Sequence, residues 1–236
     1  MGILDKIFGS NEENEYKAVV AQISNPLMDK IDTLEDREVR DFFKTILDAA
    51  ERSLRGILFM APEEFHFKKM PTKEEVDFWL RKVSLALVAY SFHFFSVEEQ
   101  PSVGQFSYKM YWQRMFDSYN KVFGENITVG EINHYAEGLK EDSEKGYSKS
   151  GDLEKMMEAT TKDHATIAIE LLKKIWHENI DSEVLNSLKA YKPHKPGYGV
   201  ERLNPIAKKT LFLGARIWQA HQQIVQPFLP KLLTDY

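Results

Sequence analysis

Residues 83–97 read VSLALVAYSFHFFSV, a run of 15 residues without charge in a chain whose residues are 28% charged. A helix that crosses a bilayer needs about 20 apolar residues, so this run is too short to span one. It is better explained as a helix buried inside a folded domain. We therefore expect it to form the central helix of the fold.

The composition is that of a globular protein that needs no disulfides. The chain has 236 residues, of which 43% are hydrophobic and none is cysteine. This length can bury a substantial core in a single domain. Zero cysteines exclude disulfides and thiolate metal sites, and we expect a cytoplasmic location. The net charge of −5 argues against nucleic acid as a partner.

Helix starts recur along the chain. Four Ser or Thr residues are each followed three positions later by an acid, the pattern of a capping box that satisfies first-turn amides. The four pairs are Ser10/Glu13, Thr33/Asp36, Thr72/Glu75 and Thr128/Glu131. Breaks are expected at prolines, Pro26 among them, and at glycine-rich or polar runs. The predicted helices are 11–24, 34–59, 73–99, 105–123, 129–145, 152–179, 182–190 and 206–226.

These helices predict an all-α fold. No segment requires a strand, so we expect a single-domain bundle of about seven to eight helices around the central apolar helix 83–97. The expected organisation is an amphipathic segment at 1–10 and a bundle domain at 11–236, with an irregular basic loop at about 189–205. Periodicity supports the helix at 34–59, whose apolar residues share one face. That face consists of Val39, Phe42, Phe43, Ile46, Ala50, Leu54 and Ile57.

Two Glu-x-x-His pairs raise the question of a di-metal bundle site. Glu63 with His66 and Glu131 with His134 have this spacing, which places two ligands on one helical face in ferritin-like proteins. On the helix 129–145, however, His134 points away from the apolar face. Such a site also needs inward carboxylates on the other helices, and the segment 206–226 contains no acid. No metal site is predicted from these pairs.

Three other histidines are expected to point into the core. His93 lies in the apolar helix, while His164 and His221 fall on the apolar faces of 152–179 and 206–226. If they met, they could bind a metal or haem, or act as a general base. The alternative is three separate core histidines, each hydrogen-bonded to a neighbour. No cofactor is predicted, and these three residues are the candidates should one bind.

Aromatic residues crowd the helix 105–123, interleaved with Lys109, Arg114 and Lys121. Aromatics at helical spacing fill a core, or they contact a protein, a small molecule or single-stranded bases. Tyrosine hydroxyls tolerate water, so we expect Tyr108, Tyr111 and Tyr119 to be the exposed members and candidates for partner binding.

The segment 189–202 departs from regular structure and is basic, with Lys189, Lys192, Lys195 and Arg202 against Glu201. A loop of this length is either a connector or a binding loop. The candidate contact residues are Tyr191, Lys192, His194, Lys195 and Tyr198.

The N-terminal residues would form a short amphipathic helix with Ile3, Leu4, Ile7 and Phe8 on one side. Two turns are not stable alone in water, so this helix must dock on something. The bundle itself, another subunit or partner, and a membrane surface contacted by residues 1–9 are the alternatives.

No glycine-rich phosphate loop, nucleophile elbow or zincin motif is present, and no family is identified. The residues favour a non-catalytic helical binding or regulatory protein whose partner is another protein, with oligomer formation an open alternative. A helical-bundle enzyme that binds a cofactor or metal through the inward histidines is the second hypothesis. A peripheral membrane protein is the third.

Overall fold

The computed structural model describes residues 11–60, 71–97, 105–128, 130, 165–190 and 203–233 of the chain. This part is helical and contains no strand, which confirms the all-α prediction. Its elements are α2 (Asn11–Asp32), α3 (Arg37–Met60), α4 (Lys73–Val97), α5 (Gln105–Phe123), α8 (Ala165–Ile175), α9 (Ser182–Ala190), α10 (Pro205–Ala220), the π-helix η4 (His221–Val225) and the 3₁₀-helix η5 (Gln226–Leu233).

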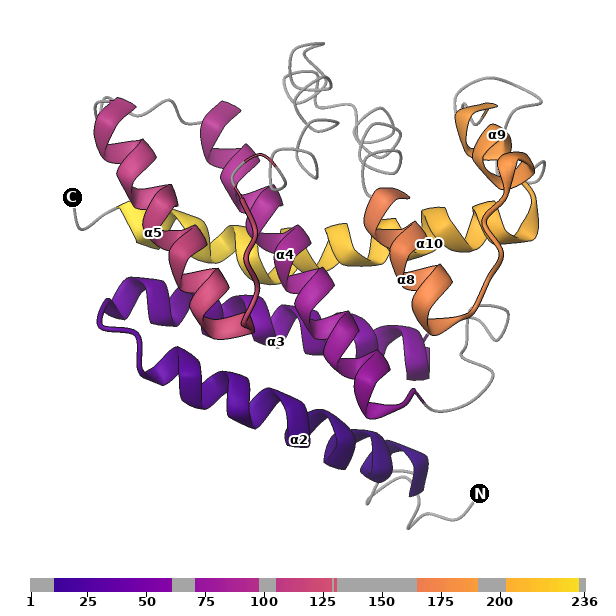
Figure 1. Cartoon of the computed structure of the whole chain (residues 1–236), viewed down its shortest axis with the longest axis horizontal. Coiled ribbons are helices and arrows are strands. Elements are labelled where there is room, and N and C mark those ends of the chain that lie inside the picture. Colours follow the sequence, from indigo (N-terminus) through magenta and orange to yellow (C-terminus); the bar gives the residue numbers. More distant parts are fainter. Residues whose placement is uncertain are drawn as a thin grey trace.

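The helices pack on one another in a bundle (Figure 1). α2 contacts both α3 and α4, while α10 contacts α3, α4 and α8. The consecutive elements α10, η4 and η5 form one long rod that passes behind α4 in the view of Figure 1. None of the described helices combines the length and the apolar character that crossing a membrane requires.

The amphipathic pattern of α3 places its apolar face in the core. All seven residues of the predicted face are buried. On the opposite face, Arg52 Nε lies 2.9 Å from Asp48 Oδ1, an i,i+4 pair at the surface. The periodicity of the sequence therefore predicted this helix and its orientation correctly.

The predicted capping box starts α4. The Thr72 N–H donates to Glu75 Oε2 at 2.7 Å, and the Glu75 N–H donates to Thr72 Oγ1 at 3.3 Å. Further along, Val83 to Ser91 are at most 2% exposed. The Trp79 Nε1–H donates to the Ala50 carbonyl at 3.0 Å, which ties α4 to α3 through a buried hydrogen bond.

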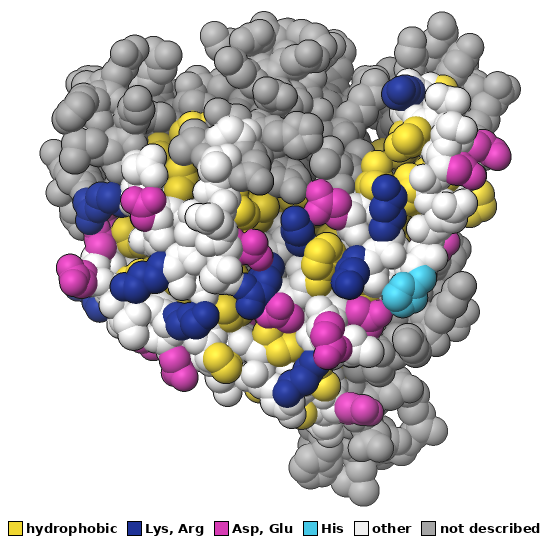
Figure 2. Space-filling view, in the orientation of Figure 1, with side chains coloured by type: hydrophobic (Ala, Val, Ile, Leu, Met, Phe, Trp, Pro, Cys, Tyr) yellow, Lys and Arg dark blue, Asp and Glu magenta, His cyan; other side chains and the backbone are white. Residues whose placement is uncertain are grey.

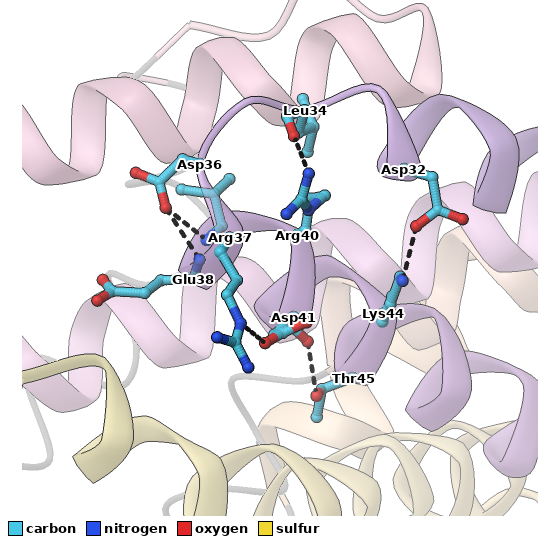
Figure 3. Close-up of polar contacts among 10 residues, drawn as sticks. Asp32, Leu34, Asp36, Arg37, Glu38, Arg40, Asp41, Lys44 and Thr45 are labelled. Atoms are coloured by element: carbon cyan, nitrogen blue, oxygen red, sulfur yellow. Dashed lines mark hydrogen bonds and ion pairs between the residues drawn. The ribbon is translucent and has the colours of Figure 1, made fainter.

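The connection between α2 and α3 differs from the prediction (Figure 3). Asp36 Oδ1 accepts from the N–H groups of Glu38 at 2.9 Å and Val39 at 3.2 Å, so Asp36 itself is the N-cap of α3. Thr33 Oγ1 instead donates to the Lys30 carbonyl at 2.7 Å, at the end of α2. The expected capping box of Thr33 with Asp36 is wrong because the Asp36 carboxylate caps the amides that follow it.

α2 continues through Pro26 to Asp32, so the predicted helix end at Pro26 is also wrong. Proline has no N–H to donate to the carbonyl of Gln22, four residues back. Both residues are exposed, so the interruption lies on the outer side of α2. Beyond the proline, Leu27 and Ile31 are buried and hold the last turns of α2 on the core.

α8 ends at Ile175, short of the predicted 179, because the chain turns at His177. His177 has φ of +53°, the left-handed conformation that costs an L-residue about 1 kcal/mol or more. Beyond it, the Glu178 N–H donates to the Leu172 carbonyl at 3.1 Å. His177 Nε2 lies 3.3 Å from Oε1 of the buried Glu75, so this turn rests against the start of α4.

The C-terminal rod begins at a strong cap and changes its helical type. Asn204 Oδ1 accepts from the N–H groups of Ile206 at 2.8 Å and Ala207 at 3.3 Å, with Pro205 in the first helical position. At the other end of α10 the chain widens into η4, where the Gln226 N–H donates to the His221 carbonyl five residues back.

Candidate functional site

An open pocket of about 580 Å³ lies on the surface where α2, α4 and α8 meet. We call it the α2–α4 pocket. Five residues of α2, five of α4 and one of α8 line it: Gln22, Ile23, Pro26, Leu27, Lys30, Lys73, Glu74, Asp77, Phe78, Arg81 and Lys174. On the face drawn in Figure 2, hydrophobic side chains show between Lys, Arg, Asp and Glu side chains.

The pocket combines apolar contacts with unneutralised positive charge. Arg81 Nε donates to Asp77 Oδ2 at 2.7 Å, which pairs one cation with one acid. This hydrogen bond raises the pKa of the Arg81 guanidinium. Among the described residues, Lys30, Lys73 and Lys174 form no ion pair and all three are exposed. Against the remaining acid, Glu74, they leave an excess of two positive charges on a chain of net charge −5.

The apolar part of the pocket comes from both long helices. Leu27 is 3% exposed, whereas Ile23 and Phe78 are half-buried and present part of their surface to the pocket. Lys82 Nζ, which is paired with Glu170 Oε2 at 3.1 Å, lies 5.9 Å from the centre of the Phe78 ring, within the range of a cation–π contact. The pocket therefore offers apolar surface beside the lysines of its lining.

A second polar cluster lies inside the bundle around His221, at the start of the π-helix. His221 is 0% exposed, as expected for an inward-facing residue of the C-terminal helix. Its ring stacks on Trp218 with centroids 5.3 Å apart and meets the edge of Tyr90 at 5.8 Å. Its Nε2 lies 3.3 Å from Ser91 Oγ on α4. The cluster thus joins α4 to the rod.

The hydrogen bonds around Ser91 assign the tautomer of His221. The Ser91 hydroxyl donates to the Leu87 carbonyl at 2.8 Å, so its oxygen is left to accept from the imidazole. The proton therefore resides on Nε2, and Nδ1 carries a lone pair. Nδ1 has no hydrogen-bond partner among the residues that the structure describes. Burial lowers the pKa of His221 from 6.5 to about 3, so the ring is neutral at physiological pH.

One prediction about the aromatic helix is wrong. Tyr119 is 1% exposed, and its hydroxyl donates to the Arg81 carbonyl at 3.0 Å. It is therefore buried with a satisfied hydroxyl instead of being available to a partner. Trp112 and Phe116, on the same helix, are buried as well.

Most other predicted site residues cannot be compared with the structure. His93 belongs to α4, but its side chain lies outside the described residues, as do the side chains of Tyr108 and Tyr111 on α5. His164 is outside entirely, so the convergence of the three histidines is untested. The remaining residues outside are Ile3, Leu4, Ile7, Phe8, Glu63, His66, Glu131, His134, Tyr191, Lys192, His194, Lys195 and Tyr198. Among the residues that are described, no three His, Asp or Glu side chains gather as a metal site would require.

Sequence reasoning missed the α2–α4 pocket. Its lysines are single charges on three separate helices, and no motif connects Lys30, Lys73 and Lys174. The nearest signal was Pro26, an exposed proline that interrupts the hydrogen bonds of α2 on the pocket side.

Comparison of the chain with protein-family models, with curated proteins and with solved structures gave no match.

Proposed function

We propose that this protein is a non-catalytic binding protein whose α2–α4 pocket receives a segment of a partner protein. The observation that carries the proposal is the composition of the pocket, in which half-buried Ile23 and Phe78 adjoin three lysines that form no ion pair with any described residue. Protein interfaces pair an apolar centre with a polar rim in this way. The cytoplasmic location expected from the lack of cysteine stays a prediction.

Catalysis has less support in the pocket. The acids of its described lining are an ion-paired Asp77 and an exposed Glu74, and no histidine, serine or threonine is among those lining residues. A nucleophile with an adjacent base, the usual arrangement for covalent catalysis, is not among the lining residues. The pocket is therefore better suited to holding a partner than to transforming a substrate.

A photo-crosslinking experiment tests this function with an internal control. Phe78 and Phe212 are both half-buried aromatics with a cation four residues later, Lys82 at 5.9 Å and Arg216 at 5.2 Å. Only Phe78 lines the pocket. A crosslinking phenylalanine analogue at position 78 should capture a defined segment of a partner in cells, whereas the same analogue at position 212 should not.

The captured segment is then identified by mass spectrometry, and the complex is rebuilt from purified proteins. Phe78→Ala should weaken it by more than about 1 kcal/mol, as truncation of a central aromatic does, while Phe212→Ala should leave the affinity unchanged. Equal crosslinking at positions 78 and 212 would refute the proposal. So would a complex whose affinity is unchanged by Phe78→Ala.

The buried His221 supports a second candidate, a helical-bundle protein that binds a metal or cofactor through core-facing histidines. Its Nδ1 lone pair is fully buried and has no partner in the described part of the chain, and a neutral imidazole nitrogen of this kind can act as a ligand or base. Metal analysis and an absorption spectrum of protein purified without a histidine tag test this candidate. A stoichiometric metal or chromophore lost on His221→Gln would favour it, and metal-free, colourless protein would count against a bound group.

A further inference from the structure

The charges around the α2–α4 pocket indicate what kind of segment it binds. This inference rests on the proposed function and adds the chemistry of the partner. Of the four cations that line the pocket, only Arg81 is neutralised within the described residues, by Asp77. A ligand with carboxylates would neutralise the other three, whereas a basic ligand would face an existing excess of positive charge.

The dimensions of the pocket suit a short helix. Its lining runs from Gln22 to Lys30 on α2 and from Lys73 to Arg81 on α4, about 12 Å along each at a rise of 1.5 Å per residue. Apolar residues at i, i+3 or i+4, and i+7 of a docked helix cover about 10 Å, so two turns match this length. An extended peptide would instead need main-chain hydrogen-bond partners along its length. The helices that line the pocket cannot supply them, because their amides and carbonyls are bonded within each helix.

The lysines are distributed toward both ends of this apolar surface. Lys30 lies in the last turn of α2, and Lys73 is the first residue of α4. In Figure 1 the C-terminal end of α2 and the N-terminal end of α4 lie on opposite sides of the view. Lys174 comes from α8, whose described C-terminal end lies on the side where α4 begins. Carboxylates at both ends of a partner helix would therefore find a cation.

We infer that the α2–α4 pocket binds an acidic amphipathic helix of a partner protein, with an apolar stripe of about two turns flanked by Asp or Glu at each end. A nucleic acid backbone fits less well, because it would leave the apolar side chains uncovered and carries charge along its whole length, not only at the ends where the lysines lie. An anionic membrane also presents uniform negative charge, which Glu74 and Asp77 would repel.

A peptide-display selection tests the partner chemistry. The library consists of amphipathic helices with a fixed apolar stripe and randomised polar positions, and it is selected on the intact chain. Selected peptides should be acidic at the ends of the stripe. They should bind Lys30→Glu/Lys73→Glu/Lys174→Glu at least about fivefold more weakly, as expected when several surface ion pairs are lost, and this variant should itself select basic peptides.

The control carries the same change in charge at lysines that do not line the pocket. Lys121, Lys173 and Lys189 are also exposed, and none is a lining residue. The triple variant Lys121→Glu/Lys173→Glu/Lys189→Glu should bind the acidic peptides as the unmodified chain does. A salt titration of the unmodified chain is a further test. Its affinity for the acidic peptides should fall as the ionic strength rises, because salt screens the ion pairs.

The outcomes separate the inference from the proposed function. If selected peptides bind Phe78→Ala as tightly as the unmodified chain, the pocket is not the binding site and the proposed function fails. If they require Phe78 but show no excess of acids, or resist added salt, only the acidic partner is refuted. Polyuridylate or phosphatidylserine vesicles that bind the intact chain, and lose binding in the pocket variant but not in the control, would also refute it.

Discussion

Replacing His221 with glutamine should make the free energy of unfolding less sensitive to acid, because the buried imidazole is a source of that sensitivity. The ring is fully buried, no charged group of the described residues compensates for its desolvation, and its pKa falls from 6.5 to about 3. Between these two values the unfolded chain binds a proton that the folded chain does not. The contribution to stability is therefore complete above pH 6.5 and is lost as the pH falls toward 3.

The size of the effect follows from the shift. One proton taken up only on unfolding changes the free energy of unfolding by about 1.4 kcal/mol per pH unit. Between pH 7 and pH 5, His221 should therefore account for a loss of about 2 kcal/mol. His221→Gln should lack this loss, whatever its stability at pH 7, because glutamine does not titrate.

Urea unfolding followed by tryptophan fluorescence measures the difference, with the free energies extrapolated to water at each pH. Other groups, including Glu51, whose pKa burial raises, contribute equally to both proteins and cancel in the comparison. His177→Gln is the matched control, since it removes an exposed histidine and keeps His221. Parallel pH profiles for the unmodified chain and His221→Gln would refute the reasoning.

Three further predictions concern single positions, each measured as a free energy of unfolding. Gly124→Ala should cost about 1 kcal/mol because Gly124 has φ of +65°; an added Cβ would come no closer than 4.0 Å to Arg81, so a much larger loss would contradict this explanation. His177→Gly should be more stable than His177→Ala by about 1 kcal/mol, because both lose the contact with Glu75 and only glycine relieves the left-handed backbone; equal stability would show that the turn is not strained. Asn204→Ala should cost about 1 kcal/mol, since two first-turn amides of α10 lose their acceptor, whereas Asn204→Ser should recover most of that loss.

The helices were predictable because their apolar residues repeat at the period of an α-helix. The inward faces of α3 and of the C-terminal helix followed from this pattern, including the burial of His221. Pro26 was misread because a proline ends a helix only when packing beyond it cannot hold the chain, and Leu27 and Ile31 are buried there. Tyr119 was misread because the acceptor for its hydroxyl, the Arg81 carbonyl, belongs to another helix.

The α2–α4 pocket could not be predicted for the same reason. Whether a lysine is paired depends on which acids approach it after folding, and Lys30, Lys73 and Lys174 look like ordinary surface residues in their own segments. The tautomer of His221 likewise depends on Ser91, a residue of α4 far away in sequence. Both features arise from contacts between helices, which a pattern within one helix does not contain.

The π-helix η4 makes the number of residues in the C-terminal rod matter as much as their identity. Its Gln226 to His221 hydrogen bond spans one residue more than an α-helical bond does. Deleting one residue between 222 and 224 would let the rod continue as a regular α-helix, because the hydrogen bond from Gln226 to His221 would then span four residues. Leu229, which is 0% exposed, would keep its place in the core, whereas a one-residue deletion in the regular helix α10 would turn it by about 100°. The π-helix is therefore the part of the rod that should tolerate the loss of one residue.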